Sequence, residues 1–337
     1  MKKYIIIFVL LLLAVSIVSA GVYFGLKFKK NTVPTVIKDN KTAHIVFTTD
    51  KNYAKYLHVA LFSAIKNKKA DSVYDISIIC VDLTEKERNY FKKFEQNNVN
   101  IRTIPVSLEE IKFGDYKIFN ERVTRADLFK FLMPKIFNNY KKILYLDADI
   151  LVRGDLLDLY NIDIGNYYLA AALKYSPHTE MLELPFRRFI WLEYNYNCGV
   201  MLLNLEKMRK NDITKKLIKA KEQDKDKALM SQTSFNEVMP TKKVIKLNPI
   251  YNFYARLSDD DFRYFELKKI YAPYLNDINS TDEFAKEAVI VHFAGPTKPW
   301  YDNDVKILHY SEEWRKYAKM ENPNWKSDGY KYHPVDY

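Results

Sequence analysis

The sequence predicts an α/β protein with a mostly parallel sheet and helices on both of its faces. Short apolar runs rich in β-branched residues alternate with segments of helical periodicity from residue 43 onward, and this order is typical of parallel sheets. With 337 residues, 48% of them hydrophobic, the chain is large enough to bury a sizeable core. Its two cysteines, Cys80 and Cys198, are too few for a disulfide scaffold.

Predicted strands and helices follow one another regularly through the first half of the chain. The predicted strands are residues 43–49, 76–81, 99–104 and 143–146, and the predicted helices are residues 53–65, 84–96 and 127–137. Thr84 and Glu87 form a capping box at the start of the second helix. The second half is less regular. Strands are expected near residues 168–172, 198–203, 244–247 and 289–292, with helices between them.

The N-terminus predicts a membrane segment. Residues 4–26 are uncharged and have lysines on both sides. As a helix they span about 34 Å, enough to cross a hydrocarbon core of about 30 Å. We therefore expect a single-pass anchor over residues 1–30 and a polar linker over 31–41. A cleaved signal peptide is the alternative, because the small residues 18–20 suit a peptidase. The flanking lysines do not decide on which side of the membrane the rest of the chain would lie.

The net charge of +11 points to anionic partners such as nucleic acid, membrane lipid or nucleotide-linked substrates. No RNA- or DNA-binding signature accompanies the charge, so we expect no nucleic-acid partner. None of the eight glycines forms a GxGxxG or GxxxxGK motif, which excludes both glycine-rich phosphate loops.

The end of the first predicted strand carries polar residues, and ligands of parallel sheets bind at the carboxyl ends of strands. Residues 48–53 read TTDKNY. Asp50 and Asn52 can hydrogen-bond a nucleotide, and Tyr53 can stack on a base. Alternatively, Asp50 or Asn52 only caps the helix that follows.

An Asp-x-Asp motif follows the predicted strand 143–146. In an extended chain Asp147 and Asp149 point to the same side, so their carboxylates converge. Two such carboxylates repel each other unless a cation lies between them. Carboxylate oxygens are ligands that Mg²⁺ and Mn²⁺ prefer, so the motif predicts a metal site.

The last predicted strand ends at His292. A histidine at such a position is usually a core residue. Together with two aspartates and a diphosphate, however, it completes an octahedral Mn²⁺ site. Gly295 would let the backbone approach a phosphate closely, and Lys298 lies between two prolines and offers a fixed cation.

Residues 145–152 (YLDADILV) and 292–300 (HFAGPTKPW) together resemble glycosyltransferase family 8, and in particular its bacterial lipopolysaccharide glucosyl- and galactosyltransferases. The resemblance runs from about Ala43 to Trp300. It implies a GT-A-type, Rossmann-like domain over residues 42–300. It also implies a UDP-hexose donor carrying glucose or galactose, a Mn²⁺ or Mg²⁺ cofactor, a glycan or glycolipid acceptor, and retention of anomeric configuration.

The resemblance implies roles for the matching residues. These are uridine binding by Thr48, Asp50, Asn52 and Tyr53, metal binding by Asp147, Asp149 and His292, diphosphate binding by Gly295 and Lys298, and catalysis by Asn197, Gln232 and Lys298. Lys130 stands where relatives carry a donor-binding arginine, and it keeps the charge without the planar fork. Ser231 and Lys174 stand where relatives carry aspartates, and Thr233 stands where they carry aspartate or glycine.

No carboxylate stands beside Gln232 in the sequence to act as a nucleophile, which favours front-side attack by the acceptor hydroxyl. Two other functions stay open: a membrane-anchored, non-catalytic sugar- or nucleotide-binding relative, and a metal-dependent hydrolase of nucleotide-sugars. The aromatic tail, residues 301–337, is expected to pack back on the domain through a helix around residues 311–319.

Overall fold

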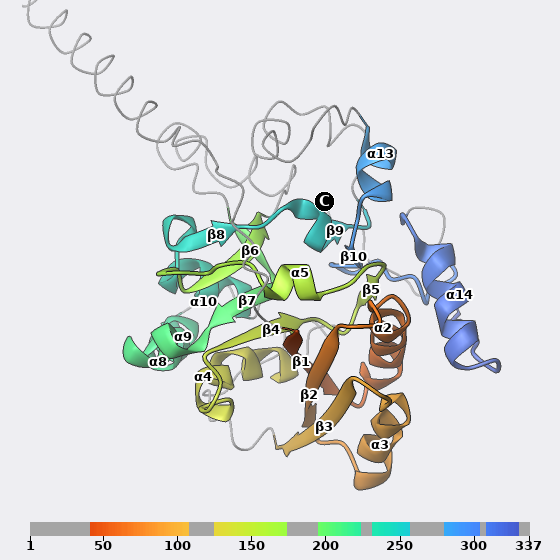
Figure 1. The fold of residues 1–337 in the computed structure, drawn as a ribbon, viewed down its shortest axis with the longest axis horizontal. Helices are drawn as coiled ribbons and strands as arrows, with labels where there is room; N and C mark the ends of the chain where they lie inside the picture. The colour runs from red at the N-terminus through yellow and green to blue at the C-terminus, as the bar shows by residue number, and fades with distance from the viewer. Residues whose placement is uncertain are drawn as a thin grey trace, which may run out of the picture. The chain divides into compact units, whose positions relative to one another are not determined.

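A seven-stranded sheet in the order β3-β2-β1-β4-β7-β6-β8 forms the centre of the fold (Figure 1). The computed structural model describes residues 41–107, 125–173, 195–223, 231–256, 280–303 and 308–329, all within one unit, residues 34–337. The strands are β1 (Thr42–Asp50), β2 (Val73–Val81), β3 (Val99–Val106), β4 (Lys142–Leu146), β6 (Leu169–Leu173), β7 (Tyr196–Asn204) and β8 (Val244–Lys246). Among them, only β7 runs antiparallel to its neighbours, so the predicted mostly parallel sheet is confirmed.

A second, three-stranded sheet has the order β5-β10-β9. Its strands are β5 (Ile150–Val152), β9 (Phe253–Tyr254) and β10 (Ile290–His292). Strand β5 begins directly after Asp149, and β10 runs antiparallel to it with His292 opposite Ile150. This register brings His292 next to the Asp-x-Asp motif, although the two are far apart in the chain.

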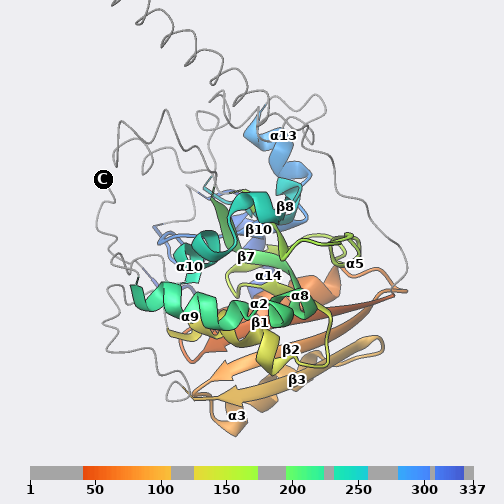
Figure 2. The same cartoon turned by 90° about the vertical axis from the view of Figure 1, so that its left-hand side faces the viewer.

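Helices cover both faces of the large sheet (Figures 1 and 2). The α-helices are α2 (Ala54–Lys66), α3 (Glu85–Asn89), α4 (Met133–Ile136), α5 (Leu157–Tyr160), α8 (Leu205–Lys210), α9 (Ile213–Gln223), α10 (Ser231–Val238), α13 (Thr281–Lys286) and α14 (Ser311–Glu321). The 3₁₀ helices are η1 (Tyr90–Phe94), η3 (Arg125–Leu132), η5 (Thr241–Lys243) and η6 (Pro249–Asn252).

The two faces of the sheet belong to two separate cores. Ile45 and Phe47 of β1 pack on one face with residues of α2, such as Leu57. Val46 points to the other face and packs with residues of η3, α9 and α10, such as Phe129. A strand buried on both sides has no polar face, which explains why β1 reads as a continuous apolar run.

Two predicted helices are shorter than the sequence pattern indicated. The predicted helix 84–96 is α3 followed by the 3₁₀ helix η1, and its capping box of Thr84 and Glu87 is present. The predicted helix 127–137 is mostly the 3₁₀ helix η3, and α4 supplies only its last turn. Pro134 lies in the first turn of α4, where its missing N–H costs no hydrogen bond.

The C-terminal part of the described chain packs on α2. Trp314 of α14 is fully buried, and its ring lies 5.4 Å from that of Trp300. Trp300 in turn stacks on Tyr56 of α2 at a centroid distance of 3.7 Å. These rings attach α14 to the same domain that carries the Asp-x-Asp motif.

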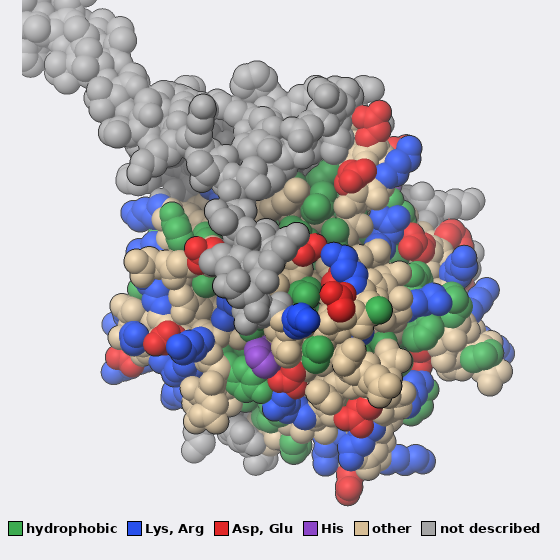
Figure 3. All heavy atoms as spheres, in the orientation of Figure 1, with side chains coloured by type: hydrophobic (Ala, Val, Ile, Leu, Met, Phe, Trp, Pro, Cys, Tyr) green, Lys and Arg blue, Asp and Glu red, His purple; other side chains and the backbone are tan. Residues whose placement is uncertain are grey.

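No helix among the described residues is both long and apolar enough to cross a membrane. The predicted membrane span lies outside the described residues, as does the predicted linker up to residue 40. Lys174 also lies outside them. On the face shown in Figure 3, Lys and Arg side chains are interspersed with Asp and Glu and form no single basic patch.

Candidate active site

Polar side chains gather at the edge of the large sheet where β1 and β4 end. Because β7 is antiparallel to β4, its first residues lie at this same edge. The Asp147 backbone N–H donates to the Gly199 carbonyl at 2.8 Å. The residues that begin β7 therefore lie beside the Asp-x-Asp motif.

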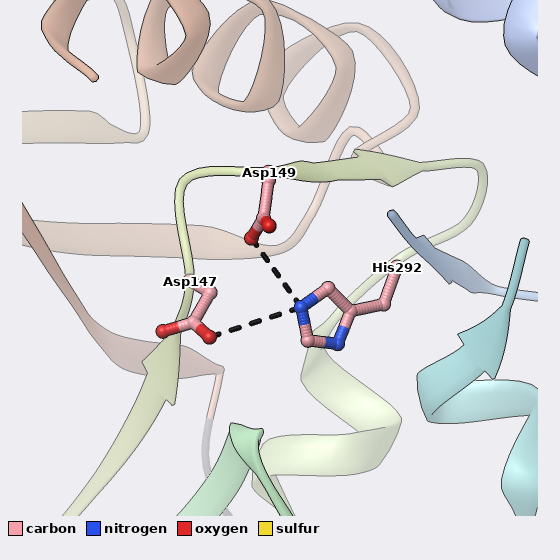
Figure 4. A group of neighbouring side chains, drawn as sticks. All are labelled: Asp147, Asp149 and His292. Carbon is pink, nitrogen blue, oxygen red and sulfur yellow. Dashed lines mark ion pairs between the residues drawn. The ribbon is translucent and has the colours of Figure 1, made fainter. Parts of the chain in front are cut away.

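Asp147, Asp149 and His292 converge on one point (Figure 4). The Nε2 atom of His292 lies 3.3 Å from Oδ1 of Asp149 and 3.7 Å from Oδ2 of Asp147. One potential ligand atom from each residue lies within 4.8 Å of the others. Two carboxylate oxygens and one imidazole nitrogen at this spacing could hold a divalent cation.

Gly199 allows the three side chains to meet. A Cβ atom at this position would lie 2.7 Å from Oδ2 of Asp147 and 2.9 Å from Nδ1 of His292, and would overlap the imidazole ring. Real Cβ atoms essentially never approach that closely. Any residue larger than glycine here would have to displace His292 or Asp147.

Lys298 contacts the oxygen of Asp149 that His292 does not contact. Its Nζ atom contacts Oδ2 of Asp149 at 2.5 Å and donates to the Phe293 carbonyl at 2.7 Å. Burial alone would lower the pKa of Lys298, but the groups around it, with the Asp149 carboxylate foremost, together raise it. Burial alone would raise the pKa of Asp149, but the neighbouring Lys298 cation above all holds it well below its usual range. Asp149 therefore stays ionised, as a metal ligand must.

Lys130 lies next to Asp147, and its ammonium group is buried between two carboxylates. Its Nζ atom contacts Oδ1 of Asp127 at 2.5 Å and Oδ1 of Asp147 at 2.9 Å. Burial alone would lower the pKa of Lys130, but the two carboxylates raise it well above the ordinary value. The Tyr145 hydroxyl donates to the same Asp147 oxygen at 2.6 Å. Oδ2 of Asp147 is the oxygen that remains on the His292 side.

The end of β1 lies at the same edge as the end of β4. The Thr48 hydroxyl is buried and has no hydrogen-bond partner among the described residues, so a ligand could supply one. Oδ1 of Asp50 accepts from the backbone N–H groups of Asn52 and Tyr53, both at 3.0 Å. That oxygen closes the turn before α2, but the helix itself begins after Tyr53 without a side-chain cap, so the capping alternative for Asp50 and Asn52 is wrong. The Tyr53 ring packs edge-on against Trp300.

Asn197 and Gln232 form a pair at the start of β7 and α10. The Asn197 side-chain Nδ2 donates to Oε1 of Gln232 at 3.1 Å. Ser231 precedes Gln232, is buried, and donates its backbone N–H to Oδ2 of Asp127 at 2.8 Å.

Gly295 has a positive φ of +86°, a conformation that favours glycine. A Cβ atom there would meet nothing within 4 Å, so the space beside it is open.

Sequence reasoning missed three residues of this site. Asn252 accepts a hydrogen bond from the His292 ring, Asp127 holds Lys130, and Gly199 makes room for the ligands. Only Gly199 carried a signal, as a glycine inside a predicted strand, which often marks close backbone approach.

Comparison with known proteins places the chain among the glycosyltransferases. The model described as Glycosyl transferase family 8 matches residues 44–304. The chain therefore belongs to glycosyl transferase family 8. Family and fold together support a glycosyl-transfer function, and the α/β fold with its mostly parallel central sheet is GT-A-like.

Three comparisons show the breadth of the similarity. A Haemophilus influenzae protein with a provisional glycosyltransferase name is 27% identical over 78% of this chain and 74% of its own length. A lipopolysaccharide 1,2-glucosyltransferase of Escherichia coli K12 is 22% identical over 87% of this chain and 81% of its own. The solved structure of galactosyltransferase LgtC with donor and acceptor sugar analogs is 25% identical, with a TM-score of 0.67 over 82% of this chain and 95% of LgtC.

Proposed function

We propose that this protein is a retaining, metal-dependent hexosyltransferase that moves glucose or galactose from a UDP-sugar to a glycan or glycolipid acceptor. The observation that carries the proposal is the convergence of Asp147, Asp149 and His292 at the strand ends of a GT-A-like domain. The names of similar proteins support the sugar classes, since they include a lipopolysaccharide glucosyltransferase and a galactosyltransferase.

Asp147, Asp149 and His292 would hold Mn²⁺ or Mg²⁺. Two hard oxygen ligands and one imidazole nitrogen suit either ion. When bound, the ion would neutralise the negative charge that develops on the departing diphosphate.

Lys298 would act on the same diphosphate. It is a buried cation held next to Asp149, with open space beside Gly295 in the same loop. Its raised pKa keeps it charged at neutral pH. A fixed cation that need not reorganise during the reaction stabilises a developing anion strongly.

The nucleoside would lie at the end of β1. Thr48 offers a buried hydroxyl without a partner among the described residues, and Tyr53 offers an aromatic ring. The second oxygen of Asp50 would be available to hydrogen-bond the nucleotide, since the described contacts engage only its Oδ1 atom.

Gln232 would face the reacting sugar, and retention would follow from front-side attack. The carboxylate of Asp127 lies next to α10, but Lys130 holds one of its oxygens and the Ser231 N–H the other. A carboxylate engaged in this way is a poor nucleophile. Gln232 would instead orient the acceptor and stabilise charge through its amide.

We also propose that residues 4–26 anchor the protein in a membrane. The support is the uncharged length of this segment, about 34 Å as a helix. An acceptor built on a lipid would then lie in the same membrane as the enzyme.

The test is a donor screen with the full chain, Mn²⁺ and a panel of UDP-sugars, in which UDP release is followed with and without acceptor glycolipid. A transferase releases UDP from a UDP-hexose mainly when acceptor is present. Equal release without acceptor would mean a nucleotide-sugar hydrolase. Binding of UDP without any turnover would mean a non-catalytic binding protein.

A further inference from the structure

A line of amide side chains joins the metal-site histidine to Gln232. Nδ1 of His292 lies 2.9 Å from Oδ1 of Asn252, and Nδ2 of Asn252 donates to Oδ1 of Asn197 at 3.0 Å. Asn197 then donates to Gln232 at 3.1 Å. These four side chains come from β10, η6, β7 and α10.

The direction of every hydrogen bond in this line is set by one backbone group. The Gly199 N–H donates to the Asn197 side chain at 2.8 Å, and a backbone N–H can only donate. The Asn197 atom it meets must therefore be the oxygen, because an amide NH₂ there would oppose another donor. Oδ1 of Asn197 has two lone pairs, so it also accepts from Nδ2 of Asn252.

This orientation leaves Oδ1 of Asn252 facing the imidazole. An amide oxygen can only accept, so Nδ1 of His292 must carry a proton. In a neutral ring the proton on Nδ1 leaves the Nε2 lone pair free. Nε2 is the atom that points toward Asp147 and Asp149. A lone pair among carboxylates is favourable only when a cation lies between them.

We propose that Asn252 is a positioning residue that holds His292 in the Nδ1-protonated tautomer needed for metal binding, through a line of amides oriented by the Gly199 N–H. The inference rests on the proposed metal-dependent function. Hydrogen bonds of this kind to metal-ligating histidines fix the ring and its tautomer, and their loss typically costs about 10–100-fold in metal affinity.

The fold holds Asn252 in place. It is 1% exposed and directly precedes β9, which pairs in parallel with β10 so that Tyr254 lies opposite His292. The same line orients the other end of the site. Because Oε1 of Gln232 accepts from Asn197, the Nε2 group of Gln232 is the end that can donate to a substrate.

Two variants of the full chain separate tautomer control from packing. Asn252→Asp keeps an oxygen that can accept the Nδ1 proton of His292. Asn252→Leu is of similar size but has no such acceptor. Both variants lose the hydrogen bond to Asn197. Free Mn²⁺ measured by electron paramagnetic resonance gives the affinity. We expect Asn252→Asp to stay within about threefold of wild type and Asn252→Leu to lose about 10–100-fold.

Asn236→Leu is the matched control. Asn236 is a neighbouring amide that bonds Tyr196 and the Gln232 backbone, and no described contact joins it to His292. We expect its Mn²⁺ affinity to be unchanged. Equal losses in Asn252→Asp and Asn252→Leu, in variants whose circular dichroism shows an intact fold, would overturn the proposal.

Nitrogen NMR of the histidine rings reads the tautomer directly. The chain has six histidines, and His292→Gln identifies the signals of His292 by their absence. With Mg²⁺ bound, we expect a protonated Nδ1 and an unprotonated Nε2, whereas a proton on Nε2 alone would contradict the assignment. Absence of hexose transfer alongside the expected tautomer and Mn²⁺ affinities would refute the proposed function and leave this inference standing.

Discussion

The Lys130 ammonium group binds the oxygen of Asp147 that faces away from His292. Nζ lies 2.9 Å from Oδ1 of Asp147, while Oδ2 lies on the His292 side of the carboxylate. The two oxygens of one aspartate are thus divided between an internal cation and the proposed metal site. Lys130, expected to bind the donor, contacts two carboxylates of the protein in this structure.

Loss of the Lys130 charge should destabilise the fold. Lys130→Met would leave Asp127 and Asp147 without their shared cation, and breaking a buried ion pair from one side costs about 3–5 kcal/mol. We expect the free energy of unfolding, measured with urea, to fall by that amount. Adding Asp127→Asn should restore part of it. A loss below about 1 kcal/mol would show that the cation is not needed to hold these carboxylates.

Gly199→Ala should disrupt the metal site. The added methyl group would overlap the His292 ring and crowd Asp147, and overpacking in a core costs about 1–3 kcal/mol. We expect that loss of stability, together with at least a tenfold loss of Mn²⁺ affinity, about 1.4 kcal/mol or more. Gly154→Ala is the control, because its Cβ would meet only the movable Val289 side chain. Wild-type Mn²⁺ affinity in Gly199→Ala would show that the ligands can shift without loss.

His58 should make the fold less stable in mild acid. Burial, with a smaller effect from Lys93, lowers the pKa of His58 from 6.5 to about 3. Between these values the unfolded chain binds a proton that the folded chain does not. Stability is therefore fully present above about pH 6.5 and falls by about 1.4 kcal/mol per pH unit below it.

His58→Phe should remove this pH dependence and keep the ring contacts with Tyr90 and Phe91. The measurement is the free energy of unfolding of both proteins at several pH values between 8 and 5. The two curves should run in parallel above about pH 6.5, and the wild-type curve should fall more steeply below it. Parallel curves over the whole range would mean that His58 accepts a proton in the folded state.

The proposed membrane anchor predicts that the full chain stays with membranes after an alkaline wash. Removal of residues 1–30 should release the protein into the soluble fraction. Mature protein that begins at Gly21 would instead identify residues 1–20 as a cleaved signal peptide.

Most strands of the sheet, and the two aspartates of the site, could be predicted because short stretches of sequence encode them. The strands β1, β2 and β4 are apolar runs, and Asp147 and Asp149 directly follow one of them. The approach of His292 depends on β5 and β10, strands of three residues each, whose pairing no local pattern encodes.

The contacts of Lys130 and Asn252 were not predictable for the same reason. Lys130 reaches Asp147 through the packing of a 3₁₀ helix on the sheet, and Asn252 meets His292 through a parallel pairing of two residues. Such contacts between distant segments follow from the assembled fold. The family resemblance implied that His292 binds the metal. It implied that Lys130 binds the donor sugar nucleotide, and it implied no role for Asn252.

The most direct measurement is the Mn²⁺ dependence of hexose transfer from a UDP-hexose to a glycolipid acceptor. Wild type is compared with Asp147→Asn and Asp149→Asn, and with Asp158→Asn, whose carboxylate forms a surface ion pair with Lys69 away from the metal site. We predict Mn²⁺-dependent transfer in wild type and Asp158→Asn, and none above background in the two metal-site variants, with all four proteins folded. Transfer at wild-type rates in both metal-site variants would contradict the account.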